Sequence, residues 1–530
     1  MELPPLTGVP RTSAATRLAH RAAVQSRGLL ALGTVAAAAI LLLFYERLSA
    51  TAPITADSAN AVLQGRAAAG GNVLLSGWRL SGASFYATDL PFYAAFSAIR
   101  GLSPAVAHDA AAAIYTLLVI AACFLARGKA KGGQGAGRMA VTLVLLLAPQ
   151  PGDAAQLLLL GPFHAGTTLV LLLALLALDA AGERVWGAAV FGVLLALAVM
   201  SDALALYVGV VPAVAVSLLR LARRRTRADV AVLVAAALSV PAALAVLGVV
   251  QQAGGFTTVP LQGALAQIEQ IPRNASLTVE GILLLFGANF FGQPLGSAGT
   301  VTILVHMAGV ALVLASCRRV LAGWRSGREP ERVTQLLVAA MAVDLAAHLF
   351  SNQAIDLRTS RYLVPFMAFG AVLAGRVGAD WLRAGRLRGA ATAIAIAYVA
   401  IAVVTLRTPP ASQPEAQLAA TLEQRQLTYG LASYWQASTV TVGSRDRVRV
   451  RAVQLATPRP SPYLWEALPS WYDPAQPGND ARFVLFDTWD PRSLDRDAIE
   501  AAFGPPAGDF RVGRYEVLVW DRNLLDGLAT

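Results

Sequence analysis

The sequence predicts an all-α polytopic membrane protein of about 11 transmembrane helices, followed by a small C-terminal α/β domain outside the membrane. Of its 530 residues, 56% are hydrophobic and only 14% are charged, and the mean hydropathy is +0.55. Soluble domains carry about 25% charged residues. Long runs such as residues 30–45 and 230–250 hold no charge at all. Because open strands cannot satisfy their backbone in lipid, these runs predict helices.

The net charge of +11 follows the pattern of a membrane protein rather than that of a nucleic-acid binder. Its basic residues cluster in short loops between the apolar runs, as cytoplasmic loops do. Residues 1–27 carry Arg11, Arg17, Arg21 and Arg27 against Glu2. This tail is therefore predicted to be cytoplasmic, in a chain placed in the plasma (inner) membrane with no nucleic-acid partner.

The transmembrane domain is predicted to span residues 28–407. Two further apolar segments within it, 149–164 and 279–291, are candidates for re-entrant turns. An odd number of crossings places the C-terminus outside. The expected helices cover residues 28–46, 109–126, 139–149, 165–180, 185–201, 203–221, 229–250, 299–317, 333–350, 361–376 and 389–406.

Residues 408–530 have a different composition and are predicted to form the extracytoplasmic α/β domain. Pro409, Pro410 and Pro414 mark a linker. Apolar spacing predicts helices at 417–427 and 495–504. Alternation and β-branched content predict strands at 438–442, 447–453, 482–487 and 514–520. The aromatic segment 428–435 is interpreted as part of this domain's core.

A long outer loop, residues 47–108, separates the first two predicted helices, and Asp57 lies near its start. Asp57 is predicted to cap or begin a helix, with Asn60 and Gln64 on the same helix face. A carboxylate in this position can take a proton from an acceptor hydroxyl. A purely structural helix cap is the alternative.

The same loop contains Asp89, Tyr86 and Trp78, which are candidates to bind an acceptor or a sugar. Aromatic side chains at a membrane surface often act as interfacial anchors instead, and an Asp shortly before a proline is typical of a turn. The sequence does not separate these alternatives.

Two further pairs are candidates to bind ions or charged groups. Asp153 and His164 flank the outer segment before the helix at 165–180, and such ligands suit Mg²⁺ or Mn²⁺, although a solvated Asp and an ordinary hydrogen-bonded His are the alternatives. Arg358 and Arg361 lie at an outer helix end, against the positive-inside bias. Guanidinium groups there match a donor phosphate or a membrane-lipid headgroup.

This layout resembles the GT-C superfamily of membrane glycosyltransferases. The features that carry the resemblance are the inside N-terminus, the long first outer loop with ITADSANAVLQGR near its start, and the outer C-terminal domain. The resemblance implies a polyprenyl-phosphate-linked sugar as donor and an extracytoplasmic glycan, lipid or protein as acceptor. It implies that Asp57 is the catalytic base, that Asp153 is a metal ligand and that Arg358 and Arg361 contact the donor phosphate. A single Asp replaces the Asp-Glu pair of several relatives, and a WWD-type motif is absent.

A non-catalytic role in envelope glycan assembly, as a lipid-linked glycan flippase or a binding subunit, is the alternative function. A flippase needs acids and bases within a central cavity. Here most candidates are predicted on the outer face, which favours an enzyme. The sequence also holds no Walker A motif, which argues against a nucleotide-driven pump.

Overall fold

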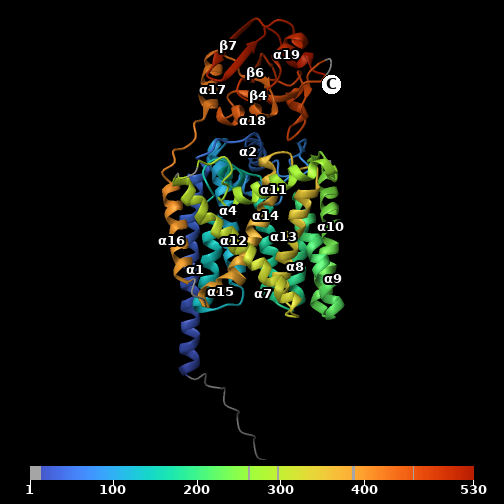
Figure 1. The fold of residues 1–530 in the computed structure, drawn as a ribbon. Helices are drawn as coiled ribbons and strands as arrows, with labels where there is room; N and C mark the ends of the chain where they lie inside the picture. Colours follow the sequence, from blue (N-terminus) through green and yellow to red (C-terminus); the bar gives the residue numbers. More distant parts are fainter. Residues whose placement is uncertain are drawn as a thin grey trace, which may run out of the picture.

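A bundle of long apolar helices carries a small sheet domain at one end (Figure 1). The computed structural model describes residues 14–147, 149–260, 263–294, 296, 298–384, 388–456 and 459–529. Within these residues, eight helices are long and apolar enough to cross a membrane, by length and composition. They are Leu30–Ser49, Pro104–Arg127, Leu206–Arg223, Arg227–Gln252, Gly299–Arg325, Arg332–Phe350, Leu357–Leu382 and Arg388–Thr405.

The predicted segments overlap helices of the bundle, although several ends differ. The all-α fold class with its C-terminal α/β domain is confirmed, while the count of about 11 transmembrane helices stays a prediction. The first helix starts at Ala14 instead of residue 28, so part of the predicted tail is helical. The bundle consists of α1 (Ala14–Ser49), α4 (Pro104–Arg127), α5 (Gly132–Leu146), α7 (Ala165–Ala181), α8 (Val185–Ser201), η1 (Leu206–Val210), α9 (Val211–Arg223), α10 (Arg227–Gln252), α12 (Ala298–Arg325), α13 (Arg332–Phe350), η3 (Leu357–Leu363), α14 (Val364–Leu373), η4 (Ala374–Gly378), α15 (Ala379–Ala384) and α16 (Arg388–Thr405).

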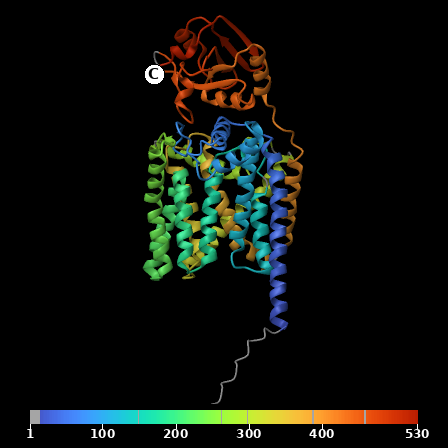
Figure 2. The same ribbon diagram turned by 180° about the vertical axis from the view of Figure 1, so that it is seen from behind.

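Short elements cover the end of the bundle that faces the sheet domain, here called the loop face (Figure 2). The two segments considered for re-entrant turns contain helices there, α6 and α11. Helix α2 begins at this face because Thr55 caps it, in a reciprocal pair of hydrogen bonds with Ser58. The elements of this face are α2 (Ala56–Ala69), β1 (Arg79–Leu80), α3 (Leu90–Arg100), α6 (Asp153–Leu159), β2 (Thr257–Thr258), η2 (Ile268–Gln270) and α11 (Ile271–Leu285).

The C-terminal domain is a six-stranded sheet in the order β5-β4-β3-β6-β8-β7, with helices on both faces. Strands β4, β3 and β6 are parallel, and β8 and β7 add antiparallel pairs. Its elements are α17 (Pro414–Gln424), β3 (Tyr429–Ala432), α18 (Tyr434–Gly443), β4 (Arg449–Gln454), β5 (Ser461–Pro462), η5 (Pro469–Tyr472), β6 (Phe483–Asp487), α19 (Arg496–Phe503), β7 (Gly508–Val512), β8 (Tyr515–Val519) and η6 (Leu524–Gly527).

One predicted strand of this domain, 438–442, is wrong: the segment lies in helix α18. Its β-branched residues favour a strand locally. In the fold, Val440 and Ala437 instead pack under the sheet. The hydroxyl of Thr441 donates to the carbonyl of Ala437 one turn earlier, which satisfies it within the helix. Tertiary packing therefore overrides the local preference.

The C-terminal domain docks directly on the loop face. Helix α18 packs on α2. In Figure 1, α18 is the lowest helix of the sheet domain, and α2 lies just below it at the top of the bundle. The backbones of Arg79 and Ala467 exchange two hydrogen bonds of 2.9 and 3.1 Å across the contact. Beside them, the rings of Trp78 and Trp471 meet edge to face, with centroids 5.3 Å apart. Parts of the first loop, α2 and residues 78–79, therefore lie against the C-terminal domain.

Candidate functional site

Asp57 lies where the two domains meet, in the first turn of α2. The hydroxyl of Tyr434, the first residue of α18, donates a 2.6 Å hydrogen bond to Asp57 Oδ1. Arg361 Nη1, from η3, lies 3.6 Å from Asp57 Oδ2. The Asp57 side chain remains 23% exposed. Three segments distant in sequence thus converge on one carboxylate that solvent or substrate can reach.

A second carboxyl group, that of Glu466, lies beside Asp57. The Tyr434 hydroxyl is 3.4 Å from Glu466 Oε2. Burial, and then the negative charge of Asp57, raise the pKa of Glu466. The same causes raise the pKa of Tyr434 well above its usual value, so its hydroxyl keeps its proton. Both shifts favour the neutral forms of Glu466 and Tyr434 beside Asp57.

Neither Tyr434 nor Glu466 was predicted as a site residue. Tyr434 belongs to the aromatic segment 428–435, which the sequence favoured as core packing. Glu466 lies in an irregular segment, with no motif around it. Its positive backbone φ of 55° and its burial are visible only in the structure.

Arg361 presents a flat cation at the same place. Its guanidinium lies over the rings of Phe163 and Tyr362, at 5.2 and 5.5 Å from their centroids. Its side chain is 30% exposed. Aromatic support fixes the plane of a guanidinium while leaving its donors available to a phosphate.

The other arginine of the predicted pair lies in different surroundings. Arg358 is exposed at the start of η3. Burial raises the pKa of Asp490 in the C-terminal domain, but hydrogen bonds from Arg492 and the charge of Arg358 outweigh it, so that this pKa is lowered. Arg358 therefore interacts electrostatically with the sheet domain, whereas Arg361 contacts Asp57.

Asn60 and Gln64 share the buried face of α2, as their spacing predicted. The hydroxyl of Ser438 donates to Asn60 Oδ1, which ties α18 to α2. Gln64 lines a small polar cavity together with Asp89 and Glu466. The cavity places two carboxyl groups, from the first loop and from the C-terminal domain, on one buried polar space.

Asp89 is buried just before α3 and accepts a 2.8 Å hydrogen bond from the hydroxyl of Thr88. Burial, reinforced by the nearby charge of Asp202, raises the pKa of Asp89 to about 7 against the opposing hydrogen bond of Thr88. Next to it, His164 Nδ1 and the hydroxyl of Thr167 lie 2.6 and 2.7 Å from Asp202 Oδ2. His164 is therefore engaged with the carboxylate of Asp202, a residue outside the predicted site.

The predicted cation ligands do not form a cluster. Asp153 is exposed at the first residue of α6, while His164 is buried against Asp202. Within the described part of the chain, no group of three or more His, Cys, Asp or Glu side chains is arranged to hold a metal ion.

The structure gives the two aromatic candidates other partners. Trp78 is 3% exposed and packs on Trp471 between the domains. The hydroxyl of Tyr86 donates to the carbonyl of Val73, and its ring lies 4.8 Å from that of Phe256. Both rings hold the loop in place.

No family model matches the chain, and no curated protein matches it. Among solved structures, it is similar to ArnT from Cupriavidus metallidurans in the apo state, with 13% identity and a TM-score of 0.44 over 96% of this chain and 100% of that one. It is also similar to the archaeal oligosaccharyltransferase AglB from Archaeoglobus fulgidus, in complex with an inhibitory peptide and a dolichol-phosphate, with 13% identity and a TM-score of 0.41. That match covers 78% of this chain, which spans 64% of the AglB chain.

Proposed function

We propose that this chain is a membrane glycosyltransferase, which moves a sugar from a polyprenyl-phosphate carrier to a hydroxyl-bearing extracytoplasmic acceptor. The single observation that carries the proposal is the pairing of Asp57 with Arg361, 3.6 Å apart and both partly exposed at the loop face. A base and a phosphate-binding cation are the two groups that this reaction needs side by side.

Asp57 is the general base in this proposal. It takes the proton of the acceptor hydroxyl as that oxygen attacks the anomeric carbon of the donor. The bond from the anomeric carbon to the carrier phosphate breaks, and its electron pair leaves with the phosphate. A single displacement of this kind inverts the configuration at the anomeric carbon.

Arg361 stabilises the departing phosphate. Its ion pair with Asp57 is loose at 3.6 Å, so a donor phosphate can take over the guanidinium while Asp57 turns to the acceptor. The rings of Phe163 and Tyr362 hold the guanidinium plane during this exchange. Arg358 lies three residues before Arg361 in η3 and is exposed, so it adds positive charge to the same element.

The C-terminal domain contributes to the site through Tyr434. Its hydrogen bond orients one oxygen of Asp57 and leaves the other facing Arg361. Orientation of a catalytic group by a fixed neighbour lowers the cost of reaching the reactive geometry. Tyr434 acts through Asp57, and is therefore a positioning residue.

The loop face is the extracytoplasmic side in this proposal. The basic loops at residues 127–138 and 220–227 join helices at the opposite end of the bundle. Lys/Arg-rich loops favour the cytoplasm. The enzyme would then bind its lipid-linked donor at the outer leaflet of the plasma membrane, where the sequence predicts the protein to lie.

The proposal is tested by reconstituting the full chain in vesicles with synthetic polyprenyl-phosphate sugars carrying a labelled glycan. Asp57→Asn is expected to abolish transfer of label to added envelope extract. Arg361→Lys keeps the charge but loses the planar donor pair, and is expected to raise the donor KM about tenfold. Glu269→Gln, an exposed acid of the loop face, serves as the control and should transfer normally.

Two outcomes would contradict an enzymatic role. Transfer that persists in the folded Asp57→Asn variant would remove Asp57 as the base. Binding of the carrier lipid without any transfer by the wild type, together with movement of the lipid across the vesicle, would support the flippase alternative instead.

A further inference from the structure

The Tyr434 hydroxyl lies between two carboxyl groups, of which the mechanism above uses only one. It donates a 2.6 Å hydrogen bond to Asp57 Oδ1 and lies 3.4 Å from Glu466 Oε2. A tyrosine hydroxyl has one proton to donate, and its oxygen can also accept a hydrogen bond. Because the short bond to Asp57 uses that proton, the contact with Glu466 becomes a hydrogen bond when Glu466 carries a proton of its own.

The surroundings of Glu466 favour this protonated form. Its side chain is buried beside the carboxylate of Asp57. Burial, and then the charge of Asp57, raise the pKa of Glu466 to about 8, although the charge of Arg361 acts in the opposite direction. Without the proton, two like charges would face each other across one hydroxyl, which is unfavourable in a buried site.

The ionisable groups around Glu466 come from several segments. They are Asp57 of α2, Asp89 and Tyr93 at the start of α3, Arg361 of η3, Tyr434 of α18 and Tyr463 after β5. Burial raises the pKa of all three tyrosines, so they remain neutral. Burial also raises the pKa of Asp89 to about 7. Glu466 and Asp89 are therefore the two acids of this set that can change charge near neutral pH.

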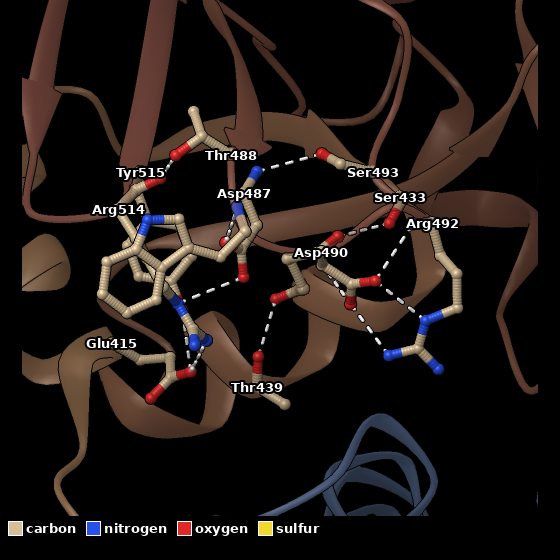
Figure 3. A network of polar contacts seen from close by, with 12 residues as sticks. Glu415, Ser433, Thr439, Asp487, Thr488, Asp490, Arg492, Ser493, Arg514 and Tyr515 are labelled. Carbon is tan, nitrogen blue, oxygen red and sulfur yellow. Dashed lines mark hydrogen bonds and ion pairs between the residues drawn. The ribbon is translucent and has the colours of Figure 1, made fainter.

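Tyr434 is held in place from within the C-terminal domain. It begins α18, and the hydroxyl of Ser433, just before it, donates to Gln436 in the first turn of the helix. Gln436 donates a 3.2 Å hydrogen bond to Asp490, which pairs with Arg492. Figure 3 shows Ser433, Asp490 and Arg492 in this network. The start of α18 is therefore braced where it presents its hydroxyl to the two carboxyl groups.

Glu466 is held against the first loop of the membrane domain. The backbone of Ala467, the next residue, exchanges hydrogen bonds of 2.9 and 3.1 Å with that of Arg79. The Glu466 side chain lines the small polar cavity that Gln64 of α2 also lines. Glu466, Tyr434 and Asp57 therefore come together only when the C-terminal domain is docked on the loop face.

We propose that Glu466 is a positioning residue for the base: its carboxyl proton is donated in a hydrogen bond to the oxygen of Tyr434, whose own proton is donated to Asp57. Successive hydrogen bonds polarise one another, so a donor at Glu466 strengthens the bond that orients Asp57. An ionised Glu466 would instead compete for the Tyr434 proton and attract Arg361, the group that the donor phosphate needs. The catalytic part of this role rests on the proposed glycosyl transfer, whereas the proton on Glu466 does not.

Transfer by the reconstituted full chain is to be measured from about pH 6 to about pH 9, on both sides of the pKa of Glu466. In wild type, the donor KM is expected to rise about fivefold as Glu466 ionises, because its new negative charge opposes the phosphate. Glu466→Gln offers an amide donor at every pH, so its donor KM should stay flat. Glu466→Leu has a similar volume and no donor, and its kcat should lie about fivefold below that of Glu466→Gln, the loss of roughly one hydrogen bond.

Two further variants serve as controls. Glu269→Gln, on an exposed acid of the loop face, should show the wild-type dependence of KM on pH. Asp89→Asn removes the other group that titrates nearby and should keep the rise in KM near pH 8. A rise that disappears in Asp89→Asn and persists in Glu466→Gln would assign the titration to Asp89 and overturn the proposal.

Infrared spectra of the same chains report the proton without any transfer. Wild type should show a protonated carboxyl band at neutral pH that is lost by about pH 9 and is missing from Glu466→Gln. In Asp57→Asn this band should disappear at a lower pH, because the like charge beside Glu466 is gone. Identical spectra of wild type and Glu466→Gln would overturn the proposal.

The two sets of data separate this proposal from the proposed function. If Asp57→Asn transfers sugar normally, the proposed base fails and the positioning role fails with it, while the infrared band still shows whether Glu466 holds a proton. If Asp57→Asn is inactive and folded Glu466→Gln and Glu466→Leu have equal kcat, the base stands and the positioning role of Glu466 is wrong.

Discussion

Tyr434 reaches Asp57 across 377 positions of sequence and donates a 2.6 Å hydrogen bond to its carboxylate. The contact joins the C-terminal domain to the first loop of the membrane domain at the residue proposed as base. It makes the sheet domain a part of the site rather than an appendage. Separating the two domains would therefore remove the group that orients Asp57.

Tyr434→Phe tests this relationship. The change removes one hydroxyl and leaves Arg361 in place, so we expect kcat to fall by about tenfold or more with little change in the donor KM. A hydrogen bond to a charged group contributes about 1.5–3 kcal/mol, which sets this scale. Steady-state transfer by the reconstituted chain measures both constants.

Tyr472→Phe is the matched control for that change. Tyr472 is a tyrosine of the same domain whose hydroxyl donates a 2.6 Å bond to the carbonyl of Ala452, away from Asp57. It should lose about 1 kcal/mol of stability and keep its transfer rate. Equal losses of kcat in both variants would mean that Tyr434 acts only through the fold of its domain.

Stability is expected to depend on pH through Asp89. Burial raises its pKa from an ordinary 3.8 to about 7 in the folded chain. Between these values the folded chain holds a proton that the unfolded chain has released, so stability falls as pH rises from about 4 to 7 and stays low above. The difference corresponds to at most about 4 kcal/mol.

Asp89→Asn keeps the shape of the protonated group and removes its titration. The thermal midpoint of the variant in detergent should match that of wild type near pH 4, exceed it increasingly up to about pH 7, and keep a constant lead above that pH. Glu269→Gln, on an exposed acid, should follow the wild-type curve. A constant difference between Asp89→Asn and wild type at every pH would show that Asp89 does not titrate on unfolding.

The sequence was sufficient to predict where the membrane helices lie and which residues of α2 share one helix face. Apolar runs set helix positions because lipid leaves the backbone no other choice. The spacing of Asp57, Asn60 and Gln64 set their common face, since helical geometry is local. These predictions needed no knowledge of distant segments.

The remainder of the site depends on how the two domains dock, which no local pattern records. Glu466 and Tyr434 come to Asp57 only through the packing of α18 on α2. The same packing turns Trp78 inward, where an exposed ring was one expectation. The two arginines of η3 also have different partners, since Arg361 lies 3.6 Å from Asp57 while the charge of Arg358 acts on Asp490 in the C-terminal domain.

Gly166 is expected to be irreplaceable for a steric reason. It lies in the first turn of α7, and a Cβ there would overlap the carboxyl group of Asp89. Gly166→Ala should therefore destabilise the chain by about 1–3 kcal/mol. Gly248→Ala, in α10 with open space around it, should be neutral or stabilising by up to about 1 kcal/mol.

The clash can be separated from a general effect on α7 by a double variant. In Asp89→Ala the carboxyl is gone, so the added methyl of Gly166→Ala meets space instead of oxygen. The two changes together should cost less than the sum of their separate costs, a coupling measured from thermal midpoints of the four chains. Strict additivity would place the cause of the Gly166→Ala loss in the helix itself rather than in its contact with Asp89.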